Sequence, residues 1–323
     1  MTMEKIRANI FVETVYPGVN VGCVVTDEGA ICIDTPLLPG EAQRWMARIR
    51  SLGAEPVRFV VYTSGQSERV LGTQYFICNQ QTAHPPRHLV QRHPRPRRVP
   101  FARQLSPVDP EPGRQVRTGA VVSHAAAWDQ VNEHRSDSFK QSMLDGFGDR
   151  DPDMVNLEVI LPQITCKERI DLFVGELTAT LLVAAKGVLW VWLPEQRVHF
   201  AGDTVVVGTH PPLALIDLRE WLTALEWLCR EPKFQDAVIV PGRGPLCDTS
   251  ATELLMEYLR LACGRTQQVY RAGRPKAELN EVAAELLPLY PVIDGQRERV
   301  QRQIKLALDD LYDAFKAEDA LSE

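Results

Sequence analysis

The chain has 323 residues, of which 45% are hydrophobic and 24% are charged, and its formal net charge is −6. This composition is that of an ordinary globular protein and excludes a collagen-like, fibrous or wholly disordered chain. The negative net charge also argues against a protein whose whole surface coats nucleic acid or an anionic membrane.

Cysteine usage and hydropathy predict a cytoplasmic protein. The cysteines number seven, which is odd, and no two of them have the C-x-x-C spacing. This pattern fits a reducing compartment and indicates neither a disulfide scaffold nor a thiolate zinc site. Residues 1–10 carry charges and lack the apolar region of a signal peptide. The most apolar stretch, residues 177–193, contains Lys186 and is too short to span a bilayer, so we expect no membrane contact.

The first 62 residues predict short strands and one helix. Apolar runs separated by the turn signals Pro17-Gly18 and Asp27-Glu28-Gly29 predict strands at 10–15, 21–25 and 30–33. A helical period over 41–52 places Trp45, Met46 and Ile49 on one face. Residues 57–62 are apolar except for Arg58, which indicates a strand buried on both faces.

Residues 80–118 differ in character from the rest of the chain. This segment holds eight prolines, eight arginines and two acidic residues, so its net charge is +6 and the rest of the chain carries −12. The prolines disfavour long helices and strand ladders, and the segment has too few apolar residues to fold alone. We interpret it as an inserted, disordered loop. A contact with an acidic partner or nucleic acid is the alternative.

Regular structure is predicted to resume after this insertion. The apolar patterns predict strands at 121–122, 157–160, 168–173, 177–184, 188–193, 198–201 and 237–240. They predict helices at 125–133, 137–144, 219–229, 252–271, 276–286 and 295–316. We therefore expect a main domain over 1–248 and a helical C-terminal extension over 249–323 packed on it.

Four segments carry motifs in a fixed order. They contain, in turn, Ile33-Asp34-Thr35, Val60-Val61-Tyr62-Thr63, Ala201-Gly202-Asp203-Thr204 and Val240-Pro241-Gly242-Arg243-Gly244-Pro245. In this order they resemble the metallo-β-lactamase superfamily, and within it the hydroxyacylglutathione-hydrolase-like branch. The resemblance covers roughly residues 10–248 outside the insertion. It implies a four-layer αββα sandwich whose site lies at one edge of its two sheets.

The resemblance also implies a site for one or two zinc ions. The superfamily motif T-H-x-H-x-D-H-x-x-G is matched by Thr63-Ser64-Gly65-Gln66-Ser67-Glu68-Arg69-Val70-Leu71-Gly72. Ser64 and Gln66 thus stand at the histidines of the first zinc site, and Glu68 and Arg69 at the aspartate and histidine of the second. The remaining ligand positions correspond to Ala184, with a margin of one residue, to Asp203, the retained bridging aspartate, and to Arg243.

These replacements predict that zinc is lost as a cofactor. Serine and glutamine oxygens bind zinc weakly, and a guanidinium does not deprotonate in a protein. Glu68 and Asp203 are the only residual metal candidates and could hold a hard ion such as Mg²⁺ weakly. The hypothesis that we prefer to a hard-ion site is a neutral cluster in which Arg69 and Arg243 pair with these two carboxylates. Arginines that point to solvent would contradict it.

Two further side chains could approach the same cleft. His210 lies seven residues after Asp203 in the sequence, although a lone loop histidine is more often structural. Cys247 follows Gly244-Pro245, but without a histidine partner it is a weak candidate nucleophile.

Three classes of function remain open from the sequence. The protein could have lost zinc hydrolysis and bind a ligand, such as a small anion, or take part in an assembly. It could instead be a hydrolase with an atypical metal site, or a metal-free one that uses Arg69 and Arg243 to hold an anionic substrate. A nucleic-acid role through the Arg-rich insertion is the least expected. The apolar face of 295–316 predicts packing on the chain itself or a homodimer.

Overall fold

The computed structural model describes residues 3–77, 90–92, 119–292 and 295–322. The predicted insertion at 80–118 lies outside these residues, apart from the strand β6 (Val90–Arg92). The chain divides into two compact units. The first comprises residues 1–183 and 187–202, and the second comprises 184–186 and 203–323.

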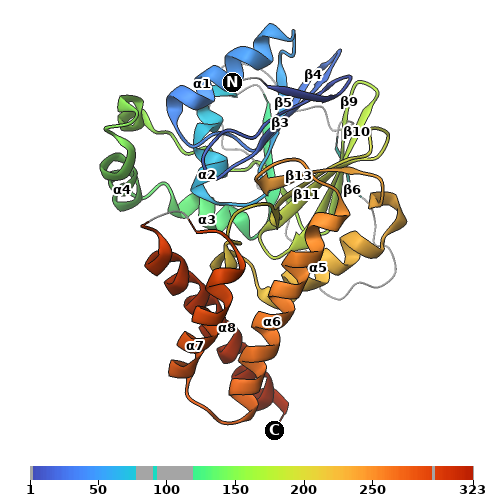
Figure 1. Ribbon diagram of the computed structural model, residues 1–323. Coiled ribbons are helices and arrows are strands. Elements are labelled where there is room, and N and C mark those ends of the chain that lie inside the picture. Colours follow the sequence, from blue (N-terminus) through green and yellow to red (C-terminus); the bar gives the residue numbers. More distant parts are fainter. Residues whose placement is uncertain (1–2, 78–89, 93–118, 293–294, 323) are drawn as a thin grey trace. The chain divides into compact units, whose positions relative to one another are not determined.

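A seven-stranded sheet forms the framework of the first unit (Figure 1). In spatial order its strands are β1 (Glu4–Arg7), β2 (Ile10–Glu13), β3 (Val21–Thr26), β4 (Gly29–Ile33), β5 (Val57–Val61), β7 (Ala120–His124) and β8 (Ile164–Cys166). Strands β1 to β4 pair antiparallel, whereas β4, β5, β7 and β8 pair parallel. The parallel half therefore brings the residues that follow β4, β5 and β7 to one edge of the sheet.

Helix α1 (Pro39–Ser51) buries its predicted apolar face in the core of this unit. Trp45 and Ile49 are fully buried, and Met46 nearly so. Pro39 suits the first helical turn because it lacks the N–H that would have no partner there. The next backbone N–H, that of Gly40, donates to Asp151 Oδ2 at 2.7 Å. A distant segment therefore caps the helix.

The segment that follows the predicted insertion has the two predicted helices but lacks one predicted strand. Helices α3 (Ala127–Glu133) and α4 (Asp137–Phe147) are present as expected, and the short η3 (Pro152–Asn156) follows. Residues 157–160, predicted as a strand, form none. Leu157, Val159 and Ile160 are nevertheless buried, and the Ile160 carbonyl accepts a hydrogen bond from Tyr62 Oη at 3.0 Å. The apolar run thus reflects burial rather than strand pairing.

A second sheet has the order β13-β12-β11-β10-β9-β6. Its remaining strands are β9 (Arg169–Val174), β10 (Leu177–Ala185), β11 (Val188–Leu193), β12 (Val198–Val206) and β13 (Val238–Arg243). Strand β12 is longer than predicted and passes from the first unit to the second at Asp203. Within the first unit the two sheets pack face to face. A Cβ on Gly22 of β3 would lie 2.2 Å from the Phe200 ring of β12.

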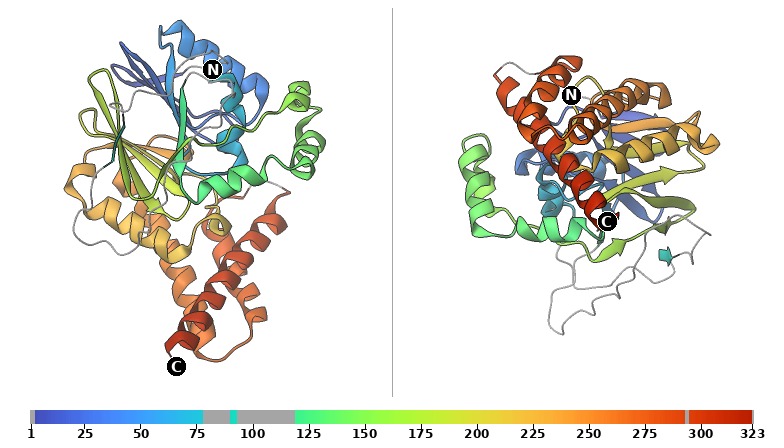
Figure 2. Two further views of the ribbon diagram at one scale, coloured as in Figure 1. Left: turned by 180° about the vertical axis from the view of Figure 1, so that it is seen from behind. Right: turned by 90° about the horizontal axis from the view of Figure 1, so that it is seen from below.

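Helices dominate the second unit (Figure 2). They are α5 (Leu218–Arg230), α6 (Thr252–Arg271), α7 (Leu279–Leu286) and α8 (Arg297–Ser322). Trp221 Nε1 of α5 donates to the Thr204 carbonyl of β12 at 2.8 Å, so α5 lies against the second sheet. The two sheets, α1 in the first unit and the helices of the second unit give the mixed α/β class that was predicted, including the helical C-terminal segment.

The C-terminal helices bury one another's apolar faces. Ile304, Leu308 and Leu311 of α8 are buried against α6 and α7 of the same chain, whereas Leu306 is 52% exposed. The face on which the homodimer prediction rests is therefore largely covered within this unit. Among the described residues, no helix combines the length and the hydropathy required to cross a membrane.

Candidate functional site

The loop after β5 carries the first two predicted ligand positions, Ser64 and Gln66. Both side chains are almost completely buried. Helix α3 packs directly on this loop, because a Cβ on Gly65 would lie 2.7 Å from Gln130 Oε1 and 2.9 Å from the Ala127 carbonyl oxygen. His134 Nε2 also lies 2.9 Å from the Gly65 carbonyl oxygen. The absence of a side chain at Gly65 therefore allows α3 to pack directly against the loop.

Arg69 is the most deeply buried charged side chain of the site, with no exposed surface. It belongs to the short helix α2 (Ser67–Val70), and its Nη1 lies 2.7 Å from Asp34 Oδ2. Thr35, the neighbour of Asp34, holds the Arg69 backbone. Its N–H and its hydroxyl donate to the Arg69 carbonyl oxygen at 2.9 and 3.0 Å.

Asp34 is held by three donors directly after β4. Its carboxylate accepts from Thr63 N at 2.7 Å, from Thr63 Oγ1 at 2.6 Å and from Arg69. Its backbone has a φ of 53°, in the left-handed region that aspartate adopts more readily than most residues. Burial raises the pKa of Asp34, and the positive charge of Arg69 and the Thr63 donors oppose that shift.

Glu68 is half-buried and lies beneath the turn around Gly18. Its Oε2 accepts from Ser67 Oγ at 3.0 Å, and a Cβ on Gly18 would lie 3.3 Å from Glu68 Cγ. This residue therefore belongs to the same unit and the same loop region as Arg69 and Ser64.

The second unit contains the predicted contact between Asp203 and Arg243. The guanidinium donates two hydrogen bonds to the carboxylate, from Nε to Oδ1 at 3.2 Å and from Nη2 to Oδ2 at 3.3 Å. The Asp203 side chain is 1% exposed, whereas that of Arg243 is 24% exposed. A bidentate arginine fits the geometry of a carboxylate and neutralises its charge. Ala184, the remaining predicted ligand position, is half-buried near the end of β10.

His210 lies in an aromatic cluster of the second unit. Its ring contacts those of Tyr258 and Tyr290 at centroid distances of 5.6 and 5.8 Å, and Tyr258 Oη lies 3.4 Å from its Nε2. Burial lowers the pKa of His210 and raises the pKa of Tyr290 to about 12. These contacts support the structural interpretation of this histidine.

The chemistry of these side chains does not fit zinc. Two of the predicted ligand positions hold guanidinium groups, which carry a permanent positive charge and donate hydrogen bonds only. Asp34 and Asp203, the buried carboxylates beside them, already accept hydrogen bonds from these guanidinium groups. Within the described part of the chain, no group of three or more His, Cys, Asp or Glu side chains is arranged to hold a metal ion.

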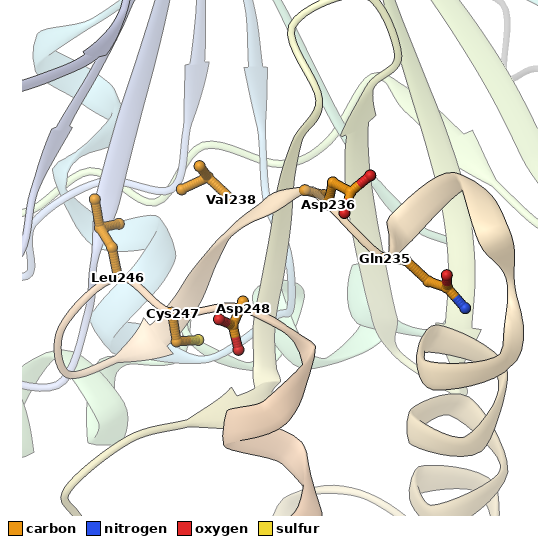
Figure 3. Close-up of a pocket in the computed structure, with 7 residues that line it drawn as sticks. Gln235, Asp236, Val238, Leu246, Cys247 and Asp248 are labelled. Atoms are coloured by element: carbon orange, nitrogen blue, oxygen red, sulfur yellow. The ribbon is translucent and has the colours of Figure 1, made fainter.

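A shallow pocket of about 470 Å³ lies in the second unit beside the start of β13 (Figure 3). Neither His210 nor any predicted ligand position lines it. Cys247, the weak candidate nucleophile, is at its wall, and burial raises the pKa of this thiol to about 12. A thiol with so high a pKa is almost entirely protonated at neutral pH and is a poor nucleophile. The lining residues are Gln235, Asp236, Ala237, Val238, Leu246, Cys247 and Asp248.

Sequence reasoning missed the partner of Arg69. In the sequence Asp34 marks only the end of a hairpin, although a carboxylate directly after a buried strand needs a counter-charge. The signal in the sequence for such a pair is an arginine, Arg69, at a motif position that is expected to be buried. The gathering of all eight predicted site residues into one cleft stays a prediction.

Comparison with known structures identifies the fold. The metallo-β-lactamase from Pontibacter korlensis is 19% identical, with a TM-score of 0.52 over 80% of this chain and 98% of that chain. A metallo-β-lactamase family protein from Thermus thermophilus is 14% identical, with a TM-score of 0.60 over 98% and 95%. The metallo-β-lactamase FIM-1 from Pseudomonas aeruginosa, solved in a mono-zinc form, is 14% identical, with a TM-score of 0.51 over 81% and 95%.

These similarities establish that the chain has the metallo-β-lactamase fold. At such low identity they show the fold alone, because one fold hosts many activities. No protein-family profile matches the sequence, and a search of curated proteins also gives no match.

Proposed function

We propose that this protein is a metallo-β-lactamase-fold protein that no longer performs zinc-dependent hydrolysis and acts as a ligand-binding or assembly protein. The observation that carries the proposal is the fully buried Arg69 guanidinium, 2.7 Å from Asp34, at a position where the resemblance expects a zinc-binding histidine. A permanent cation at that position repels a second cation and occupies the nearest carboxylate.

The pair formed by Arg243 and Asp203 supports the same proposal in the second unit. It leaves the retained aspartate neutralised by an internal guanidinium at 3.2 Å. The hydrolytic water of a zinc enzyme is acidified by the metal ion, and neither arginine can supply that Lewis acid. The side chains Ser64 and Gln66 are neutral and lack a titratable group that could replace it.

Within this proposal, the ligand class we favour is a small anion. Arg243 is 24% exposed, so part of its guanidinium remains accessible while it holds Asp203. Arginine donors suit carboxylate and phosphate groups. This residue also favours the second candidate function, a metal-free hydrolase that holds an anionic substrate with arginine.

Activity measurements separate these two functions. We expect purified protein to show no chelator-sensitive lactonase, thioesterase or β-lactamase activity. The matched control restores the motif with Ser64→His, Gln66→His, Glu68→Asp, Arg69→His, Ala184→His and Arg243→His. Activity of the original chain that a chelator abolishes would contradict the proposal. Activity that survives the chelator and is lost in Arg243→Gln would favour the second candidate.

We also propose a cytoplasmic location. None of the six described cysteines forms a disulfide, and three of them are buried in strands. Reduced cysteines in this number are usual where glutathione and thioredoxin keep thiols reduced. Labelled protein found in an oxidising compartment would contradict this location.

A further inference from the structure

Two cysteines of the first unit face each other across a hairpin. Strands β3 and β4 pair antiparallel, and in their register Cys23 lies directly opposite Cys32. Both side chains are fully buried in the same hydrophobic cluster. Their side chains therefore point to the same face of the sheet, and each is the direct cross-strand neighbour of the other.

The backbone pairing at this position suits a cross-strand link. Val25 directs its N–H and its carbonyl oxygen toward Asn9 at distances of 2.9 and 3.1 Å, away from β4. The N–H and carbonyl directions alternate along a strand, so residues two positions apart share the same direction. Cys23, two residues before Val25, therefore also turns its peptide groups away from β4. Cys23 and Cys32 thus form a non-hydrogen-bonded pair, for which the Cα separation is typically about 4.5 Å. Disulfides accept Cα separations from about 4.4 to 6.8 Å.

The side chains already interact in the reduced form. A hydrogen bond between the two thiols, together with burial, raises the pKa of Cys32 well above its ordinary value. Cys32 is therefore a protonated thiol in the closed structure, and its thiolate forms only when the hairpin opens to water. Burial makes their oxidation slow, and it also protects a disulfide once one has formed.

We propose that Cys23 and Cys32 are a dithiol–disulfide pair that locks the β3–β4 hairpin under oxidising conditions. The oxidant is a small disulfide such as oxidised glutathione. One cysteine thiolate attacks its sulfur and releases one glutathione thiolate, which leaves a mixed disulfide. The second cysteine thiolate then attacks the protein sulfur of that mixed disulfide and releases a second glutathione. Two protein thiols are oxidised to one disulfide, and one oxidised glutathione is reduced to two thiols.

The hairpin has a direct connection with the candidate site. Strand β4 ends at Ile33, and Asp34 follows it to hold Arg69. A cross-link at Cys32 therefore restrains the strand that presents Asp34. The consequence is a first unit that is harder to unfold when oxidised, because the link removes conformational freedom from the unfolded chain. This inference is independent of whether the protein binds an anion.

The test uses the full chain equilibrated in glutathione buffers of increasing oxidation, in urea below the unfolding transition so that the hairpin opens. After quenching and alkylation, both cysteines fall in one tryptic peptide, residues 8–44. We expect this peptide to lose two hydrogen atoms and to escape alkylation as the buffer becomes more oxidising. We also expect the oxidised protein to unfold at a higher urea concentration than the reduced one.

Single variants provide the controls. Cys23→Ala and Cys32→Ala should each abolish the gain in urea resistance. Cys166→Ala, which removes a buried cysteine whose strand partner is His124, should preserve it. Peptide mapping of the unsubstituted chain tests the proposal even if a variant does not fold. Residues 23 and 32 alkylated at every buffer composition, or modified only as separate glutathione adducts, would overturn the proposal.

Discussion

At the residue scale, Arg69 and Asp34 depend on each other. Replacement of Arg69 by Met would leave the 1% exposed Asp34 without its counter-charge, while Met fills much of the same volume. Removing one partner of a buried ion pair typically costs about 3–5 kcal/mol of unfolding free energy. We predict a loss of this size for Arg69→Met, measured by urea denaturation.

Two companion variants show whether charge causes this loss. Asp34→Asn combined with Arg69→Met should be less destabilised than Arg69→Met alone, because a neutral amide needs no counter-ion. Arg50→Met removes the exposed pair between Arg50 and Glu55, whose side chains are 47% and 53% exposed. That change should cost less than about 1 kcal/mol. Equal losses in Arg69→Met and Arg50→Met would contradict the importance of the buried pair.

His210 predicts a pH dependence of stability. Burial lowers the pKa of His210 in the folded protein below its ordinary value of 6.5. The unfolded chain therefore binds more protons as the pH falls through 6.5, and the folded state loses stability relative to it. We predict that His210→Gln weakens the fall in unfolding free energy between about pH 7.5 and 5. Parallel curves for both proteins would show that His210 does not contribute.

The sequence predicted one of the two arginine contacts. The contact between Arg243 and Asp203 is expected because the resemblance implies that both residues stand at ligand positions, and the contact is present. The contact between Arg69 and Asp34 cannot be deduced in the same way. It depends on the direction in which the four-residue helix α2 leaves the loop after β5. That direction is set by packing rather than by local sequence.

At the scale of elements, the close approach of β3 and β12 predicts the effect of a substitution. Any side chain at Gly22 meets the Phe200 ring, which is 2% exposed and has little room to move. Overpacking of a core typically costs about 1–3 kcal/mol. We predict that Gly22→Ala lowers the melting temperature and that added Phe200→Leu recovers part of the loss. A melting temperature unchanged by Gly22→Ala would show that the sheets can separate locally.

Elements with strong apolar patterns are predicted well, and charged or interrupted ones are not. The helix predicted at 219–229 and the strand at 188–193 match α5 and β11 closely. Strand β1 is missed because three of its four residues are charged, and it forms only by pairing with β2. Strand β12 is predicted too short because Gly202-Asp203 resembles a turn. Gly202 has a φ of 53° and continues the strand by leaving room for Thr63.

At the scale of the whole molecule, the order of motifs predicts more than any single motif. Four weak segments in sequence predict the αββα sandwich, which the structure and its similarity to solved metallo-β-lactamases confirm. The function is less accessible, because the same order of strands and turns is compatible with a zinc site or with ion pairs. The side chains at the predicted ligand positions distinguish a zinc site from ion pairs, because histidines and carboxylates bind a cation whereas arginines repel one.

The metal content of the purified protein tests the central claim most directly. The protein would be loaded with excess zinc, dialysed extensively and measured by elemental analysis, beside the variant in which histidines are restored at the ligand positions. We predict far less than one zinc per original chain and a clear gain of bound zinc in the restored variant. Near one zinc per original chain after dialysis, lost again with a chelator, would contradict the claim that arginines have replaced the metal.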